Sequence, residues 1–141
     1  MKSYTDLEQS QKLAKILPIE SADVWWAERY GGKVTHDGQY IVNEEPIYYI
    51  SYIKPSEINY SQDTVKDIPC WSLAALFNYL CEIDFFPEID ADKSGVTMNI
   101  NYYDGEDESL LVPIHNIKVK AESFIDACVE MIFTLKEKDL L

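Results

Sequence analysis

Four residues between positions 90 and 95 match the first half of a calcium-binding loop. Asp90, Asp92, Ser94 and Gly95 give the pattern D-x-D-x-S-G, in which oxygen ligands alternate along the chain and the glycine permits a sharp turn. The second half of the pattern fails, because Asn101 stands where a bidentate carboxylate is required. We therefore interpret the segment as a polar turn that enters a strand, and we expect no metal there.

Cysteine and histidine offer a second kind of chemistry. The cysteines are Cys70, Cys81 and Cys128, and the histidines are His36 and His115. Their spacing does not fit a zinc site, although a nucleophilic Cys–His pair needs only proximity in space. Helical packing explains each cysteine, so we expect free thiols and no catalytic residue. The sequence has neither G-x-S-x-G nor a glycine-rich phosphate loop, so we expect no cofactor.

Tyrosine is unusually frequent, with ten residues in the chain. Tyr48, Tyr49, Tyr52 and Tyr103 lie on segments that favour strands, and tyrosine is enriched at protein interfaces. We predict these four residues as an interaction surface, with packing within a sheet as the alternative. The acidic run at 104–108 is interpreted as a solvated hairpin tip and not as an acid–base site.

The most apolar stretch, Ile68–Cys81, predicts a buried central helix. Pro69 suits the first helical position, because its missing N–H has no partner to lose there. Cys70 and Cys81 would then lie about 16 Å apart along one face. That distance excludes a disulfide between them.

Two further segments predict amphipathic helices. The first begins at a capping box, Thr5–Glu8, and ends before Pro18. The second begins at Ser123, and its apolar residues follow helical spacing along one face. Those core positions are Phe124, Ala127, Cys128, Met131, Ile132 and Leu135.

The remaining apolar segments predict strands joined by hairpin turns. They are Ser21–Tyr30, the pair Val34–Thr35 and Tyr40–Val42 around an Asp37-Gly38 turn, Ile47–Ile53 as an interior strand or an interface, Val96–Tyr103, and the edge strand Leu110–Ile114. Hairpins favour antiparallel pairing. The sequence therefore predicts one α+β domain, residues 1–141, with an antiparallel sheet of about five strands and three helices packed mainly on one face.

Charge limits the classes of partner. The chain has 25 acidic and 12 basic residues and a net charge of −13. We expect no binding to nucleic acid or to a membrane, because phosphate groups require Lys and Arg. The first ten residues have no apolar signal-peptide core, and the cysteine count is odd, so we expect a cytoplasmic protein.

Three blocks of sequence carry a resemblance. They are LPIESAD at Leu17–Asp23, IPCWSLAALFNYL at Ile68–Leu80, and DACVEMIFTL at Asp126–Leu135. Together they resemble a family of small uncharacterised proteins from gut-dwelling Bacteroides-type bacteria, often linked to prophages or other mobile elements. Residues 31–66 and 84–122 depart from that pattern. The resemblance implies a biological context but no activity, cofactor or site residue.

These observations give three hypotheses about function. The leading one is a non-enzymatic accessory protein that binds an unidentified protein partner or associates with itself as a homodimer. The second is an acidic inhibitor that mimics DNA, suggested by the net charge and the mobile-element context. The third is an enzyme or metal-binding protein that uses Cys128 or the Asp90–Asp92 turn.

Overall fold

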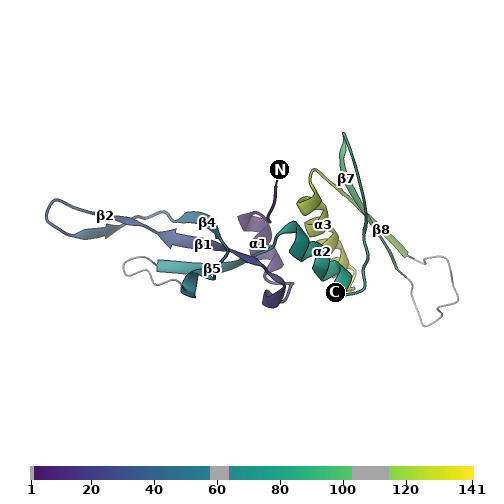
Figure 1. The fold of residues 1–141 in the computed structure, drawn as a ribbon, viewed down its shortest axis with the longest axis horizontal. Helices are drawn as coiled ribbons and strands as arrows, with labels where there is room; N and C mark the ends of the chain where they lie inside the picture. The colour runs from purple at the N-terminus through teal and green to yellow at the C-terminus, as the bar shows by residue number, and fades with distance from the viewer. Residues whose placement is uncertain (1, 58–63, 103–114) are drawn as a thin grey trace. The chain divides into compact units, whose positions relative to one another are not determined.

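The computed structural model describes residues 2–57, 64–102 and 115–141 (Figure 1). Contacts between residues divide the chain into two compact units. We call Asp6–Trp71 the arm unit, and we call Met1–Thr5 together with Ser72–Leu141 the helix-pair unit. This division concerns packing alone, so the single 1–141 domain expected from the chain length stays a prediction.

The arm unit is built on a three-stranded antiparallel sheet in the order β4-β1-β5. The central strand β1 (Val24–Tyr30) pairs with β4 (Ile47–Ser51) and β5 (Thr64–Cys70). The helix α1 (Leu7–Leu13) packs against β5. Two 3-10 helices, η1 (Ile19–Ser21) and η2 (Pro55–Glu57), lie in the connections.

The core of the arm unit gathers where α1 meets the sheet. Trp71 is fully buried there, and its indole Nε1 donates a hydrogen bond to Ser21 Oγ at 2.9 Å, so the polar end of the ring is satisfied. The surrounding core side chains are Leu13, Leu17, Val24, Ala27, Ile68 and Cys70.

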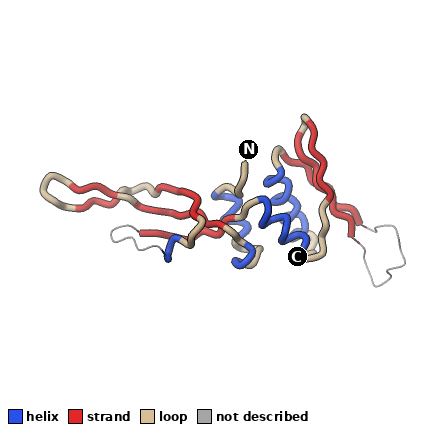
Figure 2. Tube along the Cα trace, in the orientation of Figure 1, coloured by secondary structure: helices blue, strands red, loops and turns tan. Residues whose placement is uncertain are grey.

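A two-stranded ladder extends the arm unit beyond the three-stranded sheet. It consists of β2 (Gly32–Val34) and β3 (Tyr40–Val42), which pair in an antiparallel hairpin. Figure 2 shows both ladders of this unit as red strands joined by short tan segments. Gly38 has a φ of 82°, which glycine adopts without strain, and the predicted Asp37-Gly38 turn is confirmed.

The helix-pair unit places helices on one face of a second three-stranded sheet. Its strands are β6 (Glu88–Asp92), β7 (Gly95–Tyr102) and β8 (His115–Ala121), in that order. The helix α3 (Phe124–Glu137) packs against β7 and β8, and α2 (Leu73–Glu82) packs against α3. The strand predicted from Val96 is present as β7, and its alternate residues Val96, Met98 and Ile100 are buried.

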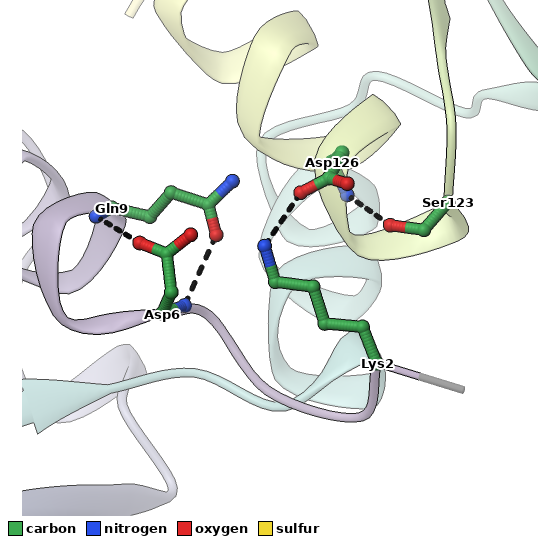
Figure 3. Close-up of polar contacts among 5 residues, drawn as sticks. All are labelled: Lys2, Asp6, Gln9, Ser123 and Asp126. Carbon is green, nitrogen blue, oxygen red and sulfur yellow. Dashed lines mark hydrogen bonds and ion pairs between the residues drawn. The ribbon is translucent and has the colours of Figure 1, made fainter.

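Side-chain caps set the start of two helices (Figure 3). In α1, the Asp6 carboxylate accepts from the Gln9 backbone N–H at 2.8 Å, and the Gln9 side chain accepts from the Asp6 N–H at 3.1 Å. The predicted box at Thr5–Glu8 is therefore one residue too early, because Asp6 is the N-cap and Thr5 is fully buried.

The start of α3 at Ser123 is confirmed. Its Oγ accepts a hydrogen bond from the Asp126 backbone N–H at 3.1 Å. The Asp126 carboxylate in turn accepts from Lys2 Nζ at 2.7 Å, which joins the N-terminal segment of this unit to α3 (Figure 3). Of the six predicted core positions, all except the half-buried Phe124 are buried.

The predicted fold class is confirmed as α+β with antiparallel pairing, but the single sheet is wrong. The described residues form three small sheets of three, two and three strands. Gly31 and residues 43–46 interrupt the long hairpin and separate β2–β3 from β1–β4. The helices do not share one face, because α1 packs against β5 and α3 packs against β7 and β8.

The helix predicted over Ile68–Cys81 is wrong in its first part. Residues 68–70 belong to β5, and α2 begins at Leu73 with Ser72 as its N-cap. The Ser72 hydroxyl accepts from the Ala75 backbone N–H at 3.2 Å. Pro69 is accommodated because β5 is an edge of its sheet within the described residues. Periodicity alone does not separate a short buried strand from a buried helix.

Two other boundaries differ from the prediction. The strand expected over Ile47–Ile53 ends at Ser51, because the Ser51 hydroxyl donates to the Ile53 carbonyl oxygen and turns the chain. Asp90 and Asp92 lie in β6, so the polar turn is shorter than expected. Gly95 is required after it, since its φ is 135° and a Cβ would lie 2.5 Å from the Ala121 carbonyl oxygen.

Some predictions fall on residues that the structure does not describe. These are Tyr103, the acidic run at 104–108 and the strand Leu110–Ile114. Strand β8 was missed, although Ile117 and Val119 alternate with lysines in the sequence. Among the helices of the described chain, none combines the length and the apolar character that crossing a membrane requires.

Candidate functional site

The two three-stranded sheets present four edge strands within the described chain, and three of them carry features that discourage further pairing. β5 contains Pro69, β6 carries Asp90 and Asp92, and β8 carries Lys118 and Lys120. Charges and proline on edge strands limit unwanted strand addition. The fourth edge, β4, has neither, since its residues are Ile-Tyr-Tyr-Ile-Ser. β4 is therefore the edge best suited to pair with another strand.

Apolar side chains around β4 are exposed to solvent. Ile47 is 60% exposed and Tyr52 is 70% exposed. The neighbouring β2–β3 ladder has two strands and no second layer among the described residues, and such a ladder buries little apolar surface of its own. Clustered exposed apolar groups are typical of interaction sites. The exposed large apolar residues on or just after β4 are Ile47, Tyr48, Tyr52 and Ile53, and the β2–β3 ladder carries Val34, Ile41 and Val42.

Three of the four predicted tyrosines lie on or just after β4. Tyr48 is 38% exposed, Tyr49 is half-buried, and Tyr52 follows the end of the strand. Tyr48 and Tyr49 point to opposite faces of the sheet, because neighbouring residues in a strand alternate. Tyr103 lies outside the described residues. Of the two alternatives expected for Ile47–Ile53, the interior strand is wrong, because β4 pairs with β1 alone in the described chain, and the interface stays a prediction.

On one face of the sheet, Tyr48 belongs to a small polar cluster. Glu28 lies directly opposite Tyr48 in the ladder. Its Oε1 accepts hydrogen bonds from the hydroxyls of Tyr48 and Tyr30, each at 3.2 Å. Burial, followed by the Glu28 charge, raises the pKa of Tyr48, and the hydrogen bond to Glu28 raises the pKa of Tyr30. Both phenols therefore remain neutral donors at physiological pH, and the cluster fixes the position of Tyr48.

The opposite face of the same sheet bears a pocket of about 320 Å³. Arg29 and Ile47 are directly opposite in the ladder, and Tyr49 lies two residues further along β4, so the three share this face. Glycine at position 32 allows a close approach of Tyr40, because a Cβ there would lie 2.6 Å from Tyr40 Cζ. The full lining is Arg29, Gly31, Gly32, Tyr40, Ile47 and Tyr49.

The sequence analysis did not find this pocket. The sequence did contain a signal for it. Arg29 comes two residues before Gly31-Gly32, and because glycine has no side chain, another segment can approach the backbone closely beside the charged group. The register that brings Ile47 and Tyr49 to Arg29 depends on pairing across the chain, which the sequence alone does not specify.

The structure separates the cysteines. Cys70 lies on β5 of the arm unit, whereas Cys81 and Cys128 lie on α2 and α3 of the helix-pair unit. All three are free thiols. Burial raises the pKa of Cys128 to about 12, so the reactive thiolate is scarce at neutral pH. This environment is typical of a core residue.

The Asp90–Asp92 segment forms part of a hairpin. The Asp92 carboxylate accepts from the Ser94 backbone N–H at 2.7 Å and from its hydroxyl at 2.6 Å. The hydroxyl bond, and then the backbone bond, lower the pKa of Asp92. Lys120 Nζ donates to Ser94 Oγ at 2.9 Å. The described residues contain no group of three histidine, cysteine or acidic side chains placed to hold a metal.

The two histidines lie in different settings. His36 is exposed beside the β2–β3 turn. His115 begins β8, and its ring stacks on Tyr102 with centroids 4.6 Å apart. Phe85 meets the same Tyr102 ring edge-on at 6.2 Å.

Comparison with known proteins gives no relative. No protein-family model, curated protein or solved structure matches this chain. The resemblance to Bacteroides-type mobile-element proteins therefore stays a prediction.

Proposed function

We propose that this protein is a binding module that takes up an extended segment of a partner protein as an additional strand beside β4. The supporting observation is that β4 lacks the charges and the proline carried by the other three-stranded-sheet edges in the described chain. In strand addition, main-chain hydrogen bonds provide affinity and alternate side chains provide specificity. The exposed Ile47 and Tyr48 supply apolar contacts on the two faces.

Charge near β4 determines the chemistry of the partner segment. Glu44 and Glu45 are both exposed and come three and two residues before the start of β4. The whole chain carries a net charge of −13, which attracts basic partners over long range. The proposed segment is therefore apolar along its middle and carries Lys or Arg at the end that passes Glu44 and Glu45.

Self-association is the other form of the same hypothesis. Two copies could pair through their β4 edges, but each brings a net charge of −13. Like net charges repel and oppose association. A partner of opposite charge is therefore the occupant that we propose. The DNA-mimic hypothesis, the cytoplasmic location and the mobile-element context stay predictions.

A peptide selection tests this proposal. The purified protein is used to select from a phage library of random ten-residue peptides, and the affinity of the recovered peptides is measured by calorimetry. We expect alternating apolar residues with Lys or Arg at one end. Ile47→Lys should weaken binding at least tenfold, because it places a charge on the edge that receives the strand. Ile19→Lys is the matched control, since Ile19 is 54% exposed but lies in η1.

The outcomes separate the alternatives. Equal weakening by Ile47→Lys and Ile19→Lys, or no peptide recovered above background, would contradict strand addition at β4. Analytical ultracentrifugation tests the alternative that a second copy of this protein pairs with β4. A stable homodimer that Ile47→Lys dissociates would overturn the separate partner and assign the edge to self-association.

A further inference from the structure

The pocket on the Arg29 face combines three kinds of chemistry in a small volume. Arg29 supplies a guanidinium, Tyr40 and Tyr49 supply phenol rings, and Ile47 supplies an aliphatic wall. Its volume of about 320 Å³ lies at the lower end of the range for small-molecule sites, about 300–1,000 Å³. The pocket therefore suits a compact ligand.

The cation identifies the polar part of that ligand. A guanidinium has five N–H donors in a planar fork, so it can bind a carboxylate alongside another partner. Among the described residues of the lining, Arg29 is the sole basic one. A phosphate dianion binds most strongly where several cationic side chains surround it. A carboxylate carries one negative charge, which a single guanidinium can match with two parallel hydrogen bonds. A net charge of −13 also disfavours a doubly charged anion.

The walls identify the apolar part. Two tyrosine rings offer faces and edges for a flat aromatic body. The absence of a side chain at Gly32 leaves room in the pocket, because any side chain there would collide with Tyr40 and with the Ile41 carbonyl oxygen. An aromatic body carrying one carboxylate therefore matches the lining.

We propose that this pocket binds an aromatic carboxylate, with the carboxylate on Arg29 and the ring between Tyr40 and Tyr49. The proposal does not require strand addition, because Arg29 and Tyr40 lie outside β4, although Ile47 and Tyr49 of β4 also line the pocket. An aromatic carboxylate of this kind could come from two sources. One is a free small molecule, and the other is the terminal carboxylate of a peptide that ends in an aromatic residue.

The test is a titration of the full-length, ¹⁵N-labelled protein followed by NMR. Benzoate represents the free small molecule, and N-acetyl-phenylalanine represents the peptide terminus. Each is paired with its neutral amide. We expect benzoate to shift the amide signals of the pocket residues with a dissociation constant on the order of 1 mM, as its small size permits. Benzamide should bind at least tenfold more weakly, because it lacks the charge.

Variants of the protein sharpen the result. Arg29→Gln should weaken benzoate binding at least tenfold, and Arg29→Lys should weaken it less, because it keeps the charge and loses the fork. Lys33→Gln is the matched control, since Lys33 is a nearby cation on β2 outside the pocket lining. A larger response to N-acetyl-phenylalanine than to benzoate would assign the pocket to a peptide terminus.

Several results would overturn the proposal. These are equal binding of the acid and its amide, signal shifts outside the pocket, or equal effects of Arg29→Gln and Lys33→Gln. If Arg29→Gln fails to fold, the comparison of acid with amide on the unaltered protein decides. Arg29→Gln separates this proposal from strand addition, because it changes the pocket and leaves β4 unaltered, whereas Ile47→Lys changes both.

Discussion

At the scale of single residues, two of the three cysteines are fully buried, Cys70 in β5 and Cys128 in α3. Helical spacing predicted Cys128 on the core face of its helix, and it is fully buried there. Cys70 is also fully buried, but it lies in a strand. Burial follows from apolar character, which a sequence shows directly. The element that buries a residue depends on pairing with distant segments, which local spacing does not encode.

The raised pKa of Cys128 predicts low reactivity. With a pKa of about 12, its thiolate fraction at pH 8 is roughly a thousandth of that of an ordinary thiol. Iodoacetamide should therefore modify the folded protein at Cys81, which is partly exposed, long before Cys128. Mass spectrometry of the alkylated peptides measures both rates, and unfolding in urea should make them equal. Faster modification of Cys128 than of Cys81 in the folded protein would contradict the buried position.

The same pKa predicts the sign of a pH effect on stability. A pKa of about 12 in the folded protein lies above the ordinary value of 9.0. The neutral thiol therefore stabilises the fold below pH 9, and this contribution is lost as pH rises towards 12. The slope is at most about 1.4 kcal/mol per pH unit. Urea unfolding of wild type and Cys128→Ala across this range should show a steeper loss for wild type, and equal slopes would contradict the assignment.

At the scale of elements, turn chemistry was the most reliable signal. Asp37-Gly38 predicted a hairpin and Ser123 predicted a helix start, and both are confirmed. Sheet membership was not predictable, because Gly31 and residues 43–46 divide one long hairpin into two ladders. The unprotected edge of β4 became visible only when the register with β1 was known. Its tyrosines were nevertheless selected from residue type alone.

The two adjacent glycines make a matched pair for testing the β2–β3 ladder. A Cβ at Gly32 would lie 2.4 Å from the Ile41 carbonyl oxygen, whereas at Gly31 the nearest atom would be 3.8 Å away. Gly32→Ala should therefore destabilise the protein by about 1–3 kcal/mol, as overpacking does. Gly31→Ala should change the free energy of unfolding by less than about 0.5 kcal/mol. Urea denaturation measures both, and similar effects would contradict the close packing at Gly32.

At the scale of the whole molecule, net charge and the β4 edge act on different steps of the proposed binding. The net charge of −13 acts over long range and speeds the encounter with a basic segment. The contacts at β4 act after docking and govern dissociation. Composition alone is enough to propose the first effect, because net charge does not depend on the fold. The second effect required the sheet, and the sequence predicted a different one.

Ionic strength should separate these two contributions. Raising the salt concentration from about 0.05 M to 0.5 M shortens the screening length below about 5 Å. The association rate of a selected basic peptide should then fall about tenfold or more, while its dissociation rate changes little. Stopped-flow fluorescence measures both rates. An association rate that is insensitive to salt would contradict the charge-based choice of partner.

Amide hydrogen exchange with a selected peptide bound tests the central claim most directly. If the peptide adds as a strand, backbone N–H groups within Ile47–Ser51 become hydrogen-bonded, and their exchange should slow at least tenfold. The amides of β8, an edge carrying Lys118 and Lys120, serve as the internal reference and should not change. Slower exchange within β4 alone is the result that strand addition predicts. Unchanged exchange in β4 while the peptide is bound would contradict it.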